Sequence, residues 1–277
     1  MQISDFTEEI HIKTFGEDEI VFSEGDFSDS TMYCLLEGAA SVCKDRNGSL
    51  AEINTIYDGE FFGEIGLIQN VPRLATIRIV SPKAKVAIIS KNNFYSIIQK
   101  KPSFLFLFLK SARERVFQAE SKIVRLLEST GSDVEFDVSK TRIDDWNILG
   151  YVNQVSTKTF KNKDIVLDSE EREDEQLHFV IEGMVRVERK AKSGRFYEVN
   201  VLTPGELFGN TKNPLEDNYP LRVTAITEPT QTGTLERNMF GKVCQLNPEF
   251  LFHVIKTLLW RLHVTEDKIS HLVNVDT

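Results

Sequence analysis

The chain repeats itself, and this repeat limits the folds open to it more than any other feature. The spacing is 145 residues in the first part of each copy and 146 residues in the rest. The matching pairs are Thr14-Phe15 with Thr159-Phe160, Ile20-Val21 with Ile165-Val166, Glu37-Gly38 with Glu182-Gly183, Gly59-Glu60 with Gly205-Glu206, and Phe62-Gly63 with Phe208-Gly209. Self-similarity at a fixed spacing indicates a duplicated structural unit. At 277 residues the chain can form two domains of ordinary size, each with its own core.

Each copy has short apolar runs separated by turn residues, followed by one long helical pattern. Asn47-Gly48 and Ser193-Gly194 lie between alternating runs, as the loops of β-hairpins do. Residues 1–13 and about 142–155 are predicted to be short helical segments that lead into each copy. The pattern predicts a mainly β fold with helices, of the α+β class.

The two long helices have recognisable ends. They are predicted to begin at Lys101-Pro102 and Asn247-Pro248, because proline suits the first position of a helix. Gly131 is a suitable residue to end the first helix. The expected organisation is a first domain at 1–130, a polar linker at 131–144 and a second domain at 145–277.

The stretch from residue 61 to 77 gathers one acid, one arginine and several small residues. Gly63 permits the backbone to approach a ligand closely. The residues after it have the pattern of one helical turn, whose free N–H groups favour an anion; they are Glu64, Ile65, Gly66 and Leu67. Glu64 can accept hydrogen bonds from a sugar hydroxyl.

Arg73 supplies the positive charge of this stretch. Pro72 fixes the approach to Arg73, whose planar guanidinium can bind two phosphate oxygens at once. The following residues begin an apolar run, and their N–H groups are placed to complete a phosphate site; they are Leu74, Ala75 and Thr76. The alternative is a surface turn with an incidental Glu64–Arg73 ion pair, worth about 0–1 kcal/mol if exposed. The combination favours a nucleotide sensor.

This stretch resembles the phosphate-binding cassette of the cyclic nucleotide-binding domain, the β-roll module of protein kinase A regulatory subunits and bacterial catabolite activator proteins. The residues that carry the resemblance are Phe62, Gly63, Glu64, Leu67, Pro72, Arg73, Ala75 and Thr76. The resemblance implies two tandem, jelly-roll-like β-rolls, each followed by a long C-terminal helix. It also implies that Glu64 binds the ribose 2′-hydroxyl and that Arg73 binds the cyclic phosphate.

The resemblance also suggests which ligand binds. Family members that prefer cyclic GMP often have threonine directly after the phosphate-binding arginine, and here that residue is Leu74. Cyclic AMP is therefore the expected ligand, with cyclic GMP less favoured and no metal required. The predicted ligand-binding residues are Phe62, Gly63, Glu64, Ile65, Gly66, Arg73, Leu74 and Ala75.

The second copy departs from this pattern where the chemistry matters. Asn210 replaces the acid, and the loop Thr211–Tyr219 is two residues longer than its counterpart. Leu221 takes the position of the arginine, and Arg222 follows one place late, which in an extended segment turns its side chain to the opposite face. The acidic run at 168–175 would not attract a phosphate. We expect the second copy to be a structural or regulatory partner of the first.

The long helices carry apolar residues at alternating spacings of four and three. These residues are Leu105, Leu109, Ala112, Val116, Ala119, Ile123 and Leu126, then Leu251, Ile255, Leu258, Leu262, Thr265, Ile269 and Leu272. This spacing is typical of a coiled coil. One hypothesis pairs residues 105–126 with 251–272 in parallel, either within one chain or between two chains of a homodimer. In the other, each apolar stripe packs only on its own β-roll.

Composition excludes several classes of protein. The net charge of −9 argues against a nucleic-acid partner. No apolar run approaches 18 residues, so no membrane span is expected, and the acidic N-terminal segment favours the cytoplasm. Cys34, Cys43 and Cys244 have no metal-ligand spacing and are predicted to be small core residues.

The residues do not suggest an enzyme. The five histidines form no cluster in the sequence, and there is no Gly-x-Ser-x-Gly elbow, P-loop or Cys-His pairing. A basic inhibitor segment or a helix-turn-helix would accompany the module in the families it resembles, and neither is recognisable here. We therefore expect the output to pass through an effector protein after ligand binding moves the helix at 102–130. The alternative function is a non-binding scaffold made of two degenerate modules.

Overall fold

The computed structural model describes residues 10–46, 48–69, 71–101, 103–131, 155–170, 176–209 and 219–273. Two compact units divide the chain, and each is described by itself. Unit 1 consists of Met1–Ala119 and Glu266–Thr277, and unit 2 of Glu120–Thr265. The predicted linker at 131–144 and the predicted lead-in at 142–155 fall almost wholly outside the described residues, so the domain boundaries stay predictions.

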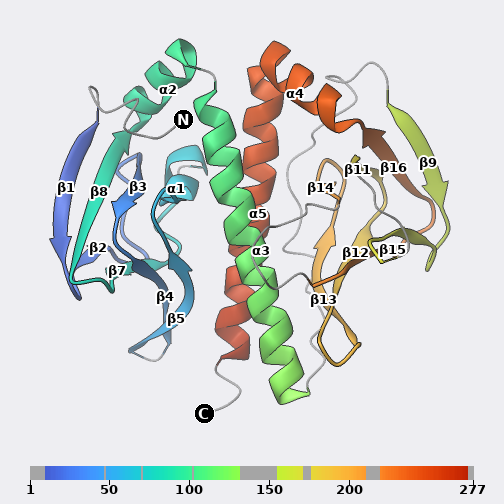
Figure 1. Cartoon of the computed structure of the whole chain (residues 1–277), viewed down its shortest axis with the longest axis horizontal. Helices are drawn as coiled ribbons and strands as arrows, with labels where there is room; N and C mark the ends of the chain where they lie inside the picture. The colour runs from blue at the N-terminus through green and yellow to red at the C-terminus, as the bar shows by residue number, and fades with distance from the viewer. Residues whose placement is uncertain are drawn as a thin grey trace. The chain divides into compact units, whose positions relative to one another are not determined.

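Unit 1 contains the first β-roll, which is built from two antiparallel sheets (Figure 1). One sheet has the order β1-β8-β3-β6, with bounds β1 His11–Gly16, β8 Lys83–Ser90, β3 Thr31–Glu37 and β6 Phe61–Phe62. The other has the order β2-β7-β4-β5, with bounds β2 Ile20–Phe22, β7 Thr76–Ile79, β4 Ala40–Arg46 and β5 Ser49–Ile56. The first four residues of β8 alternate between exposed and buried, as in a strand with one face toward the core, and Ala87 and Ile89 are buried as well.

Two local predictions for this roll have different outcomes. The hairpin predicted at Gly48 is confirmed, because β4 pairs with β5 and Gly48 has a positive φ of 82°. The helix predicted at 1–13 is wrong where the structure describes it. Residues from His11 onward form β1, which pairs antiparallel with β8 and buries Phe15. Pairing with a neighbouring strand overrode the local helical pattern.

Unit 1 also contains two short helices and the first part of a long one. The short α1 spans Glu64–Gln69, as the cassette pattern predicted. The helix α2, Lys91–Lys100, was not anticipated, although Ser90 caps it by accepting a hydrogen bond from Asn93 N at 3.2 Å. The long helix α3 spans Phe104–Thr130.

The ends of α3 test two predictions. Its start was placed at Lys101-Pro102, but Lys101 is the non-helical residue that ends α2, and α3 begins only at Phe104. The predicted stop at Gly131 is confirmed. Gly131 has φ 66°, and its N–H donates to Leu127 O at 3.0 Å, which satisfies one of the last helical carbonyls.

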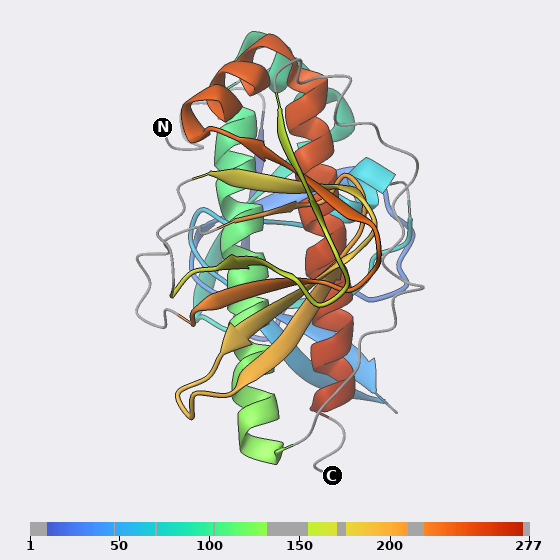
Figure 2. The same cartoon turned by 90° about the vertical axis from the view of Figure 1, so that its right-hand side faces the viewer.

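Unit 2 contains the second β-roll, again with two antiparallel sheets (Figure 2). One has the order β14-β11-β16-β9, with bounds β14 Leu207–Phe208, β11 Leu177–Glu182, β16 Thr230–Leu235 and β9 Ser156–Phe160. The other has the order β10-β15-β12-β13, with bounds β10 Ile165–Asp168, β15 Leu221–Ala225, β12 Val185–Lys190 and β13 Phe196–Leu202. The predicted turn at Gly194 is confirmed, since it joins the antiparallel strands β12 and β13 and has φ 88°.

The second roll leads into α4, Arg237–Leu246, and then α5, Pro248–Leu272, whose predicted start at Pro248 is confirmed. Both units contain parts of both long helices. Unit 1 has α3 up to Ala119 and α5 from Glu266, while unit 2 has α3 from Glu120 and α5 up to Thr265. The pairing of 105–126 with 251–272 stays a prediction.

The cysteines are core residues, as predicted. Cys34, Cys43 and Cys244 are free thiols and all three are buried. Burial raises the pKa of Cys34 and of Cys244 to about 12. Within the described residues, no group of three or more His, Cys, Asp or Glu is placed to hold a metal ion. Over the same residues, no helix is long and apolar enough to cross a membrane.

Candidate nucleotide site

The cassette begins where β6 turns into α1. Phe62 is fully buried at the end of β6, and Gly63 makes the turn with a positive φ of 70°. A Cβ at Gly63 would lie 2.8 Å from Nη1 of Arg73 and 3.1 Å from ring atoms of Phe22 and Tyr33. Both the backbone conformation and the crowding therefore require glycine at this position.

Arg73 is folded against the start of α1, with only 4% of its surface exposed. Its Nη1 donates to Gly63 O at 2.8 Å and to Thr31 O at 3.0 Å. Its Nη2 donates to Asp29 Oδ1 at 2.7 Å and to Thr31 Oγ1 at 2.9 Å. Because Gly63 immediately precedes Glu64, these bonds bring the predicted phosphate-binding arginine beside the predicted ribose-binding acid.

Aromatic rings fix the orientation of the guanidinium. The guanidinium carbon of Arg73 lies 4.5 Å from the ring centroid of Phe22 and 5.4 Å from that of Tyr33. Tyr33 in turn stacks on Phe62, with centroids 5.3 Å apart. Cation–π contacts of this kind stabilise a buried positive charge. The site thus holds the arginine in one place, with its charge paired to Asp29.

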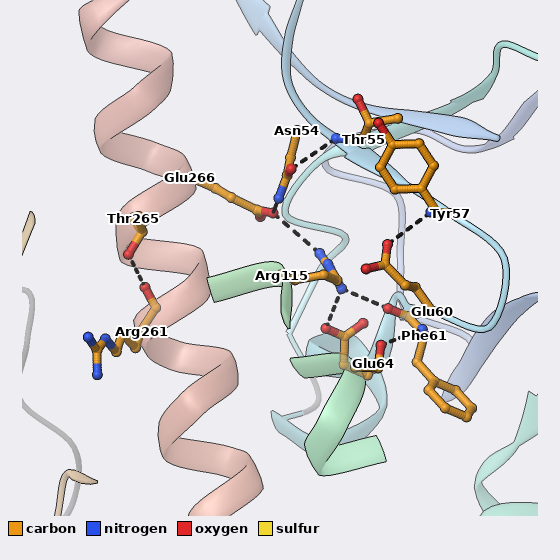
Figure 3. A network of polar contacts seen from close by, with 11 residues as sticks. Asn54, Thr55, Tyr57, Glu60, Phe61, Glu64, Arg115, Arg261, Thr265 and Glu266 are labelled. Carbon is orange, nitrogen blue, oxygen red and sulfur yellow. Dashed lines mark hydrogen bonds and ion pairs between the residues drawn. The ribbon is translucent and has the colours of Figure 1, made fainter. Parts of the chain in front are cut away.

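Glu64 is also buried, at 2% exposed, and has a strong internal partner (Figure 3). Arg115 of α3 donates from Nη1 to Glu64 Oε1 at 2.9 Å, and from Nη2 to Glu266 Oε1 at 3.3 Å. Burial raises the pKa of Glu64, while the positive charge of Arg115 opposes that rise. Glu64 therefore shares one arginine with a residue of α5 that belongs to the same unit.

The helix α3 holds the backbone immediately before the cassette. Phe61 N donates to Ser111 Oγ at 2.9 Å, and Phe61 O accepts from Arg115 Nη1 at 2.8 Å. The ring of Phe61 also makes edge contacts with Phe104 and Phe108, at centroid distances of 5.5 and 5.3 Å. Both polar backbone groups of Phe61 are thus fastened to α3, so movement of the cassette and of this helix must be linked.

The other predicted site residues lie in the same segment. Ile65 and Gly66 are in α1, and a Cβ at Gly66 would lie 2.7 Å from Ser28 Oγ. Leu74 and Ala75 are half-buried in the extended segment that leads into β7. The structure gathers the predicted residues around Gly63, and their assignment as ligand contacts remains a prediction.

Sequence reasoning missed four residues of this arrangement: Asp29, Thr31, Arg115 and Glu266. A signal for two of them was available in the repeat, because Arg115 and Arg261 are 146 residues apart, as are Glu120 and Glu266. In unit 2 the equivalent contact is present, since Arg261 Nη2 binds Glu120. The repeat therefore preserves an arginine–glutamate contact between α3 and α5 in each unit.

The second cassette does not have the predicted alignment. Cys43 of β4 pairs with Thr76, and its repeat counterpart Glu188 of β12 pairs with Arg222, so Arg222 corresponds to Thr76 and Leu221 to Ala75. The predictions that Leu221 takes the position of Arg73 and that the second loop is two residues longer are therefore wrong.

Leu221 is buried, whereas Arg222 lies on the other face of β15. There its Nε donates to Asp168 Oδ2 at 3.0 Å and its guanidinium lies 3.7 Å from the ring centroid of Phe196. Arg222 thus lies on the face of β15 opposite to Leu221, as the period of a strand predicted. Asn210 and most of the loop Thr211–Tyr219 lie outside the described residues.

Unit 2 has a buried ionic cluster of its own. Glu120 is fully buried and accepts a hydrogen bond from Arg189 Nε at 2.8 Å as well as from Arg261. Burial alone would raise the pKa of Glu120, but the two arginines lower it below its ordinary value. Glu120 is therefore held ionised between two cations, an arrangement suited to a structural role.

Comparison with known proteins fits this geometry. The family model of the cyclic nucleotide-binding domain matches residues 12–101 and 157–247, one match in each copy. The chain belongs to the cyclic nucleotide-binding domain family. The expected tandem pair of β-roll modules is thereby confirmed, and the chain carries regulatory modules like those of protein kinase A regulatory subunits.

The relatives include regulatory subunits and kinases. The cAMP-dependent protein kinase regulatory subunit of Mucor circinelloides f. lusitanicus is 30% identical over 97 residues, which is 35% of this chain and 22% of that protein. The cGMP-dependent protein kinase of Eimeria tenella is 25% identical over 230 residues, 83% of this chain and 20% of that protein. The matched regions thus span about a fifth of these relatives.

Among solved structures, the regulatory domain of Toxoplasma gondii protein kinase A, crystallised with cAMP, is 19% identical. The match covers 89% of this chain and 87% of that one, with a TM-score of 0.32.

Proposed function

We propose that this chain is a cyclic nucleotide sensor whose first β-roll binds cyclic AMP in preference to cyclic GMP. The observation that carries the proposal is the position of Arg73, buried and bonded to the residue before Glu64. A fixed guanidinium bonded to the residue that precedes an acid suits a ligand that combines an anionic phosphate with neighbouring sugar hydroxyls. Leu74 offers no hydroxyl to a guanine amino group, which supports the preference for adenine.

The proposed contacts divide between the two residues. Arg73 binds the cyclic phosphate, and the turn at Gly63 and Gly66 lets the backbone of α1 come close to it. Glu64 accepts a hydrogen bond from the ribose 2′-hydroxyl in its ionised form. Because Glu64 already accepts from Arg115, the ribose must compete with that arginine or share its acceptor.

This competition supplies the proposed signal. Arg115 is anchored on α3 and also donates to Phe61 O and to Glu266 on α5. A ligand that draws Glu64 away from Arg115 changes the balance of these contacts and shifts the population of positions that α3 can take. We propose that an effector protein, whose identity is open, responds to this change. The second roll is proposed to act as a structural or regulatory partner.

A non-binding scaffold is the second candidate function. The observation that favours it is that both Arg73 and Glu64 have internal partners, as purely structural ion pairs would. Buried charges that are already paired need no ligand to be stable.

Thermal unfolding with added nucleotides separates the two candidates. A ligand that binds only the folded state stabilises it by about 2.7 kcal/mol at 100 times its dissociation constant. If the chain is a sensor, cyclic AMP should raise its unfolding temperature, and cyclic GMP should raise it by less. The unfolding temperature should not change with 5′-AMP, which lacks the cyclic phosphate. A scaffold would show the same unfolding temperature with all three.

A further inference from the structure

The loop between β2 and β3, residues 23–30, lies directly along Arg73. Gly25 N donates to Arg73 O at 2.8 Å, and Arg73 N donates to Asp26 O at 2.9 Å. These two backbone bonds fasten the first half of the loop to the arginine. Its second half carries Ser28 and Asp29 and is fastened at its end, where Lys91 N donates to Ser30 O at 3.0 Å. Asp29 itself meets the guanidinium through its side chain.

Asp29 supplies the only carboxylate that the structure places on Arg73 among the described residues. Its Oδ1 accepts from Arg73 Nη2 at 2.7 Å and from Thr31 Oγ1 at 2.5 Å. The Arg73 side chain is 3% exposed, whereas the Asp29 side chain is 61% exposed. The carboxylate therefore reaches the guanidinium from the solvent side, the direction from which a soluble anion would arrive.

The guanidinium has few donors left for a ligand. It carries five N–H groups, two on each terminal nitrogen and one on Nε. The four terminal groups are matched by Gly63 O, Thr31 O, Thr31 Oγ1 and Asp29 Oδ1. For two phosphate oxygens to be bound side by side, one of these acceptors must give way.

Asp29 is the acceptor best able to leave. The carbonyl groups of Gly63 and Thr31 belong to the cassette turn and to β3, so moving them would disturb regular structure. The Asp29 side chain can turn into water while the backbone bonds of Gly25 and Asp26 to Arg73 remain. An anion then replaces an anion, and the buried charge of Arg73 stays balanced.

Ser28 extends the same loop over α1. It is buried, and its Oγ lies 2.7 Å from the position that a Cβ of Gly66 would take. The second half of the loop therefore covers both the arginine and the first turn of the helix that is proposed to face the phosphate.

We propose that Asp29 competes with the phosphate of the ligand for Arg73, so that the β2–β3 loop sets the affinity of the first β-roll. The proposal rests on the proposed function and adds a residue that weakens binding. The opposite role is that Asp29 positions Arg73 for the ligand and strengthens binding. The two roles predict opposite signs for the same substitution.

Calorimetric titration of the full chain with cyclic AMP distinguishes them, using Asp29→Asn and a matched control. Asp18→Asn removes the same charge from the other described aspartate–arginine pair of this roll, where Asp18 lies 3.7 Å from Arg78 on the surface. Asparagine also tolerates the positive φ of 63° at residue 18. Asp29→Asn is expected to bind about fivefold more tightly than the wild type, and Asp18→Asn to bind like the wild type.

Asp29→Ala is the second variant, since it removes the acceptor as well as the charge, and it is expected to bind at least as tightly as Asp29→Asn. Unchanged or weaker binding by both Asp29 variants, with wild-type unfolding temperatures, overturns the competition while leaving the proposed function in place. An absence of binding by all four proteins overturns the proposed function and this inference together.

Discussion

Arg115 donates to Glu64 at 2.9 Å, which joins the acid predicted to bind ribose to the long helix α3. The same arginine donates to Glu266 at 3.3 Å, and Asn54 Nδ2 donates to the same oxygen of Glu266 at 3.1 Å. Three segments far apart in the sequence therefore meet at one guanidinium. A ligand at Glu64 cannot bind without affecting this junction.

Glu266→Gln tests that link. With Glu266 neutral, Glu64 is the one carboxylate still hydrogen-bonded to Arg115 among the described residues, with Glu60 adding a weaker attraction, and Glu64 becomes less available to a ribose hydroxyl. We expect affinity for cyclic AMP to fall by about fivefold or more. Asp267→Asn is the matched control, because it removes the same charge from the next residue along α5. Equal affinities of the Glu266 variant and the wild type for cyclic AMP would show that Glu266 does not influence the ligand site.

Arg73→Lys tests the phosphate contact. Lysine keeps the charge but lacks the planar fork, so affinity for cyclic AMP should fall at least about tenfold. The variant should also lose about 1–3 kcal/mol of stability, because carbonyl groups that now accept from the guanidinium lose their donors. Arg78→Lys, on the neighbouring strand β7, is the control for a general effect of lysine. Calorimetry measures the affinity and chemical denaturation measures the free energy of unfolding. Unaltered affinity in the Arg73 variant would show that Arg73 does not bind the phosphate.

Stability should depend on pH through Glu206. Burial raises the pKa of Glu206 to about 7, against 4.5 for an ordinary glutamate, although the Thr203 N–H partly opposes this. Between these values the folded chain holds a proton that the unfolded chain has lost. The stabilisation is therefore complete below pH 4.5 and is lost as the pH rises through 7, by up to about 3 kcal/mol.

Glu206→Gln should remove this dependence and make the chain more stable than the wild type at pH 8. The comparison is the denaturation midpoint at pH 5 and at pH 8, with the exposed Glu17→Gln as a control. Glu60, whose pKa is also raised by burial, adds a dependence of the same sign in unit 1. A Glu206 variant that retains the full pH dependence of the wild type would show that this carboxyl is ionised in the fold.

The thiols should be unreactive in the folded chain. All three cysteines are buried, and burial raises the pKa of Cys34 and Cys244 to about 12, so the reactive thiolate is scarce at pH 8. A chromogenic disulfide reagent should react slowly with the native chain and rapidly with three thiols after denaturation. Rapid reaction of two thiols in the native chain would contradict the described burial.

The sequence predicted features that depend on local chemistry. The turn at Gly63, the hairpins at Gly48 and Gly194 and the stop at Gly131 each require a residue that tolerates positive φ, and glycine marks these places visibly. The orientation of Arg222 opposite to Leu221 followed from the period of a strand, whereas the match of Leu221 to Arg73 was wrong because pairing with β12 sets the register of β15.

Other features could not be read locally. The start of β1, His11–Lys13, was predicted as helix because its identity depends on pairing with β8, about 70 residues away. Contacts of Arg115 with Glu266 join residues 151 positions apart, and only the repeat hinted at them. The helix α2 was not predicted, although Ser90 provides a local cap for it. Asp29 lies in a polar loop, where nothing in the sequence marks it as a partner of Arg73.

The most direct measurement is calorimetric titration of the full chain with cyclic AMP and, separately, with cyclic GMP, read for stoichiometry as well as affinity. We predict one site per chain, with tighter binding of cyclic AMP, because the first cassette keeps Glu64 and Arg73 while the second has Asn210 in place of the acid. Binding of two nucleotides per chain would contradict the structural role assigned to the second roll. An absence of heat and of thermal stabilisation with either nucleotide would contradict the sensor itself.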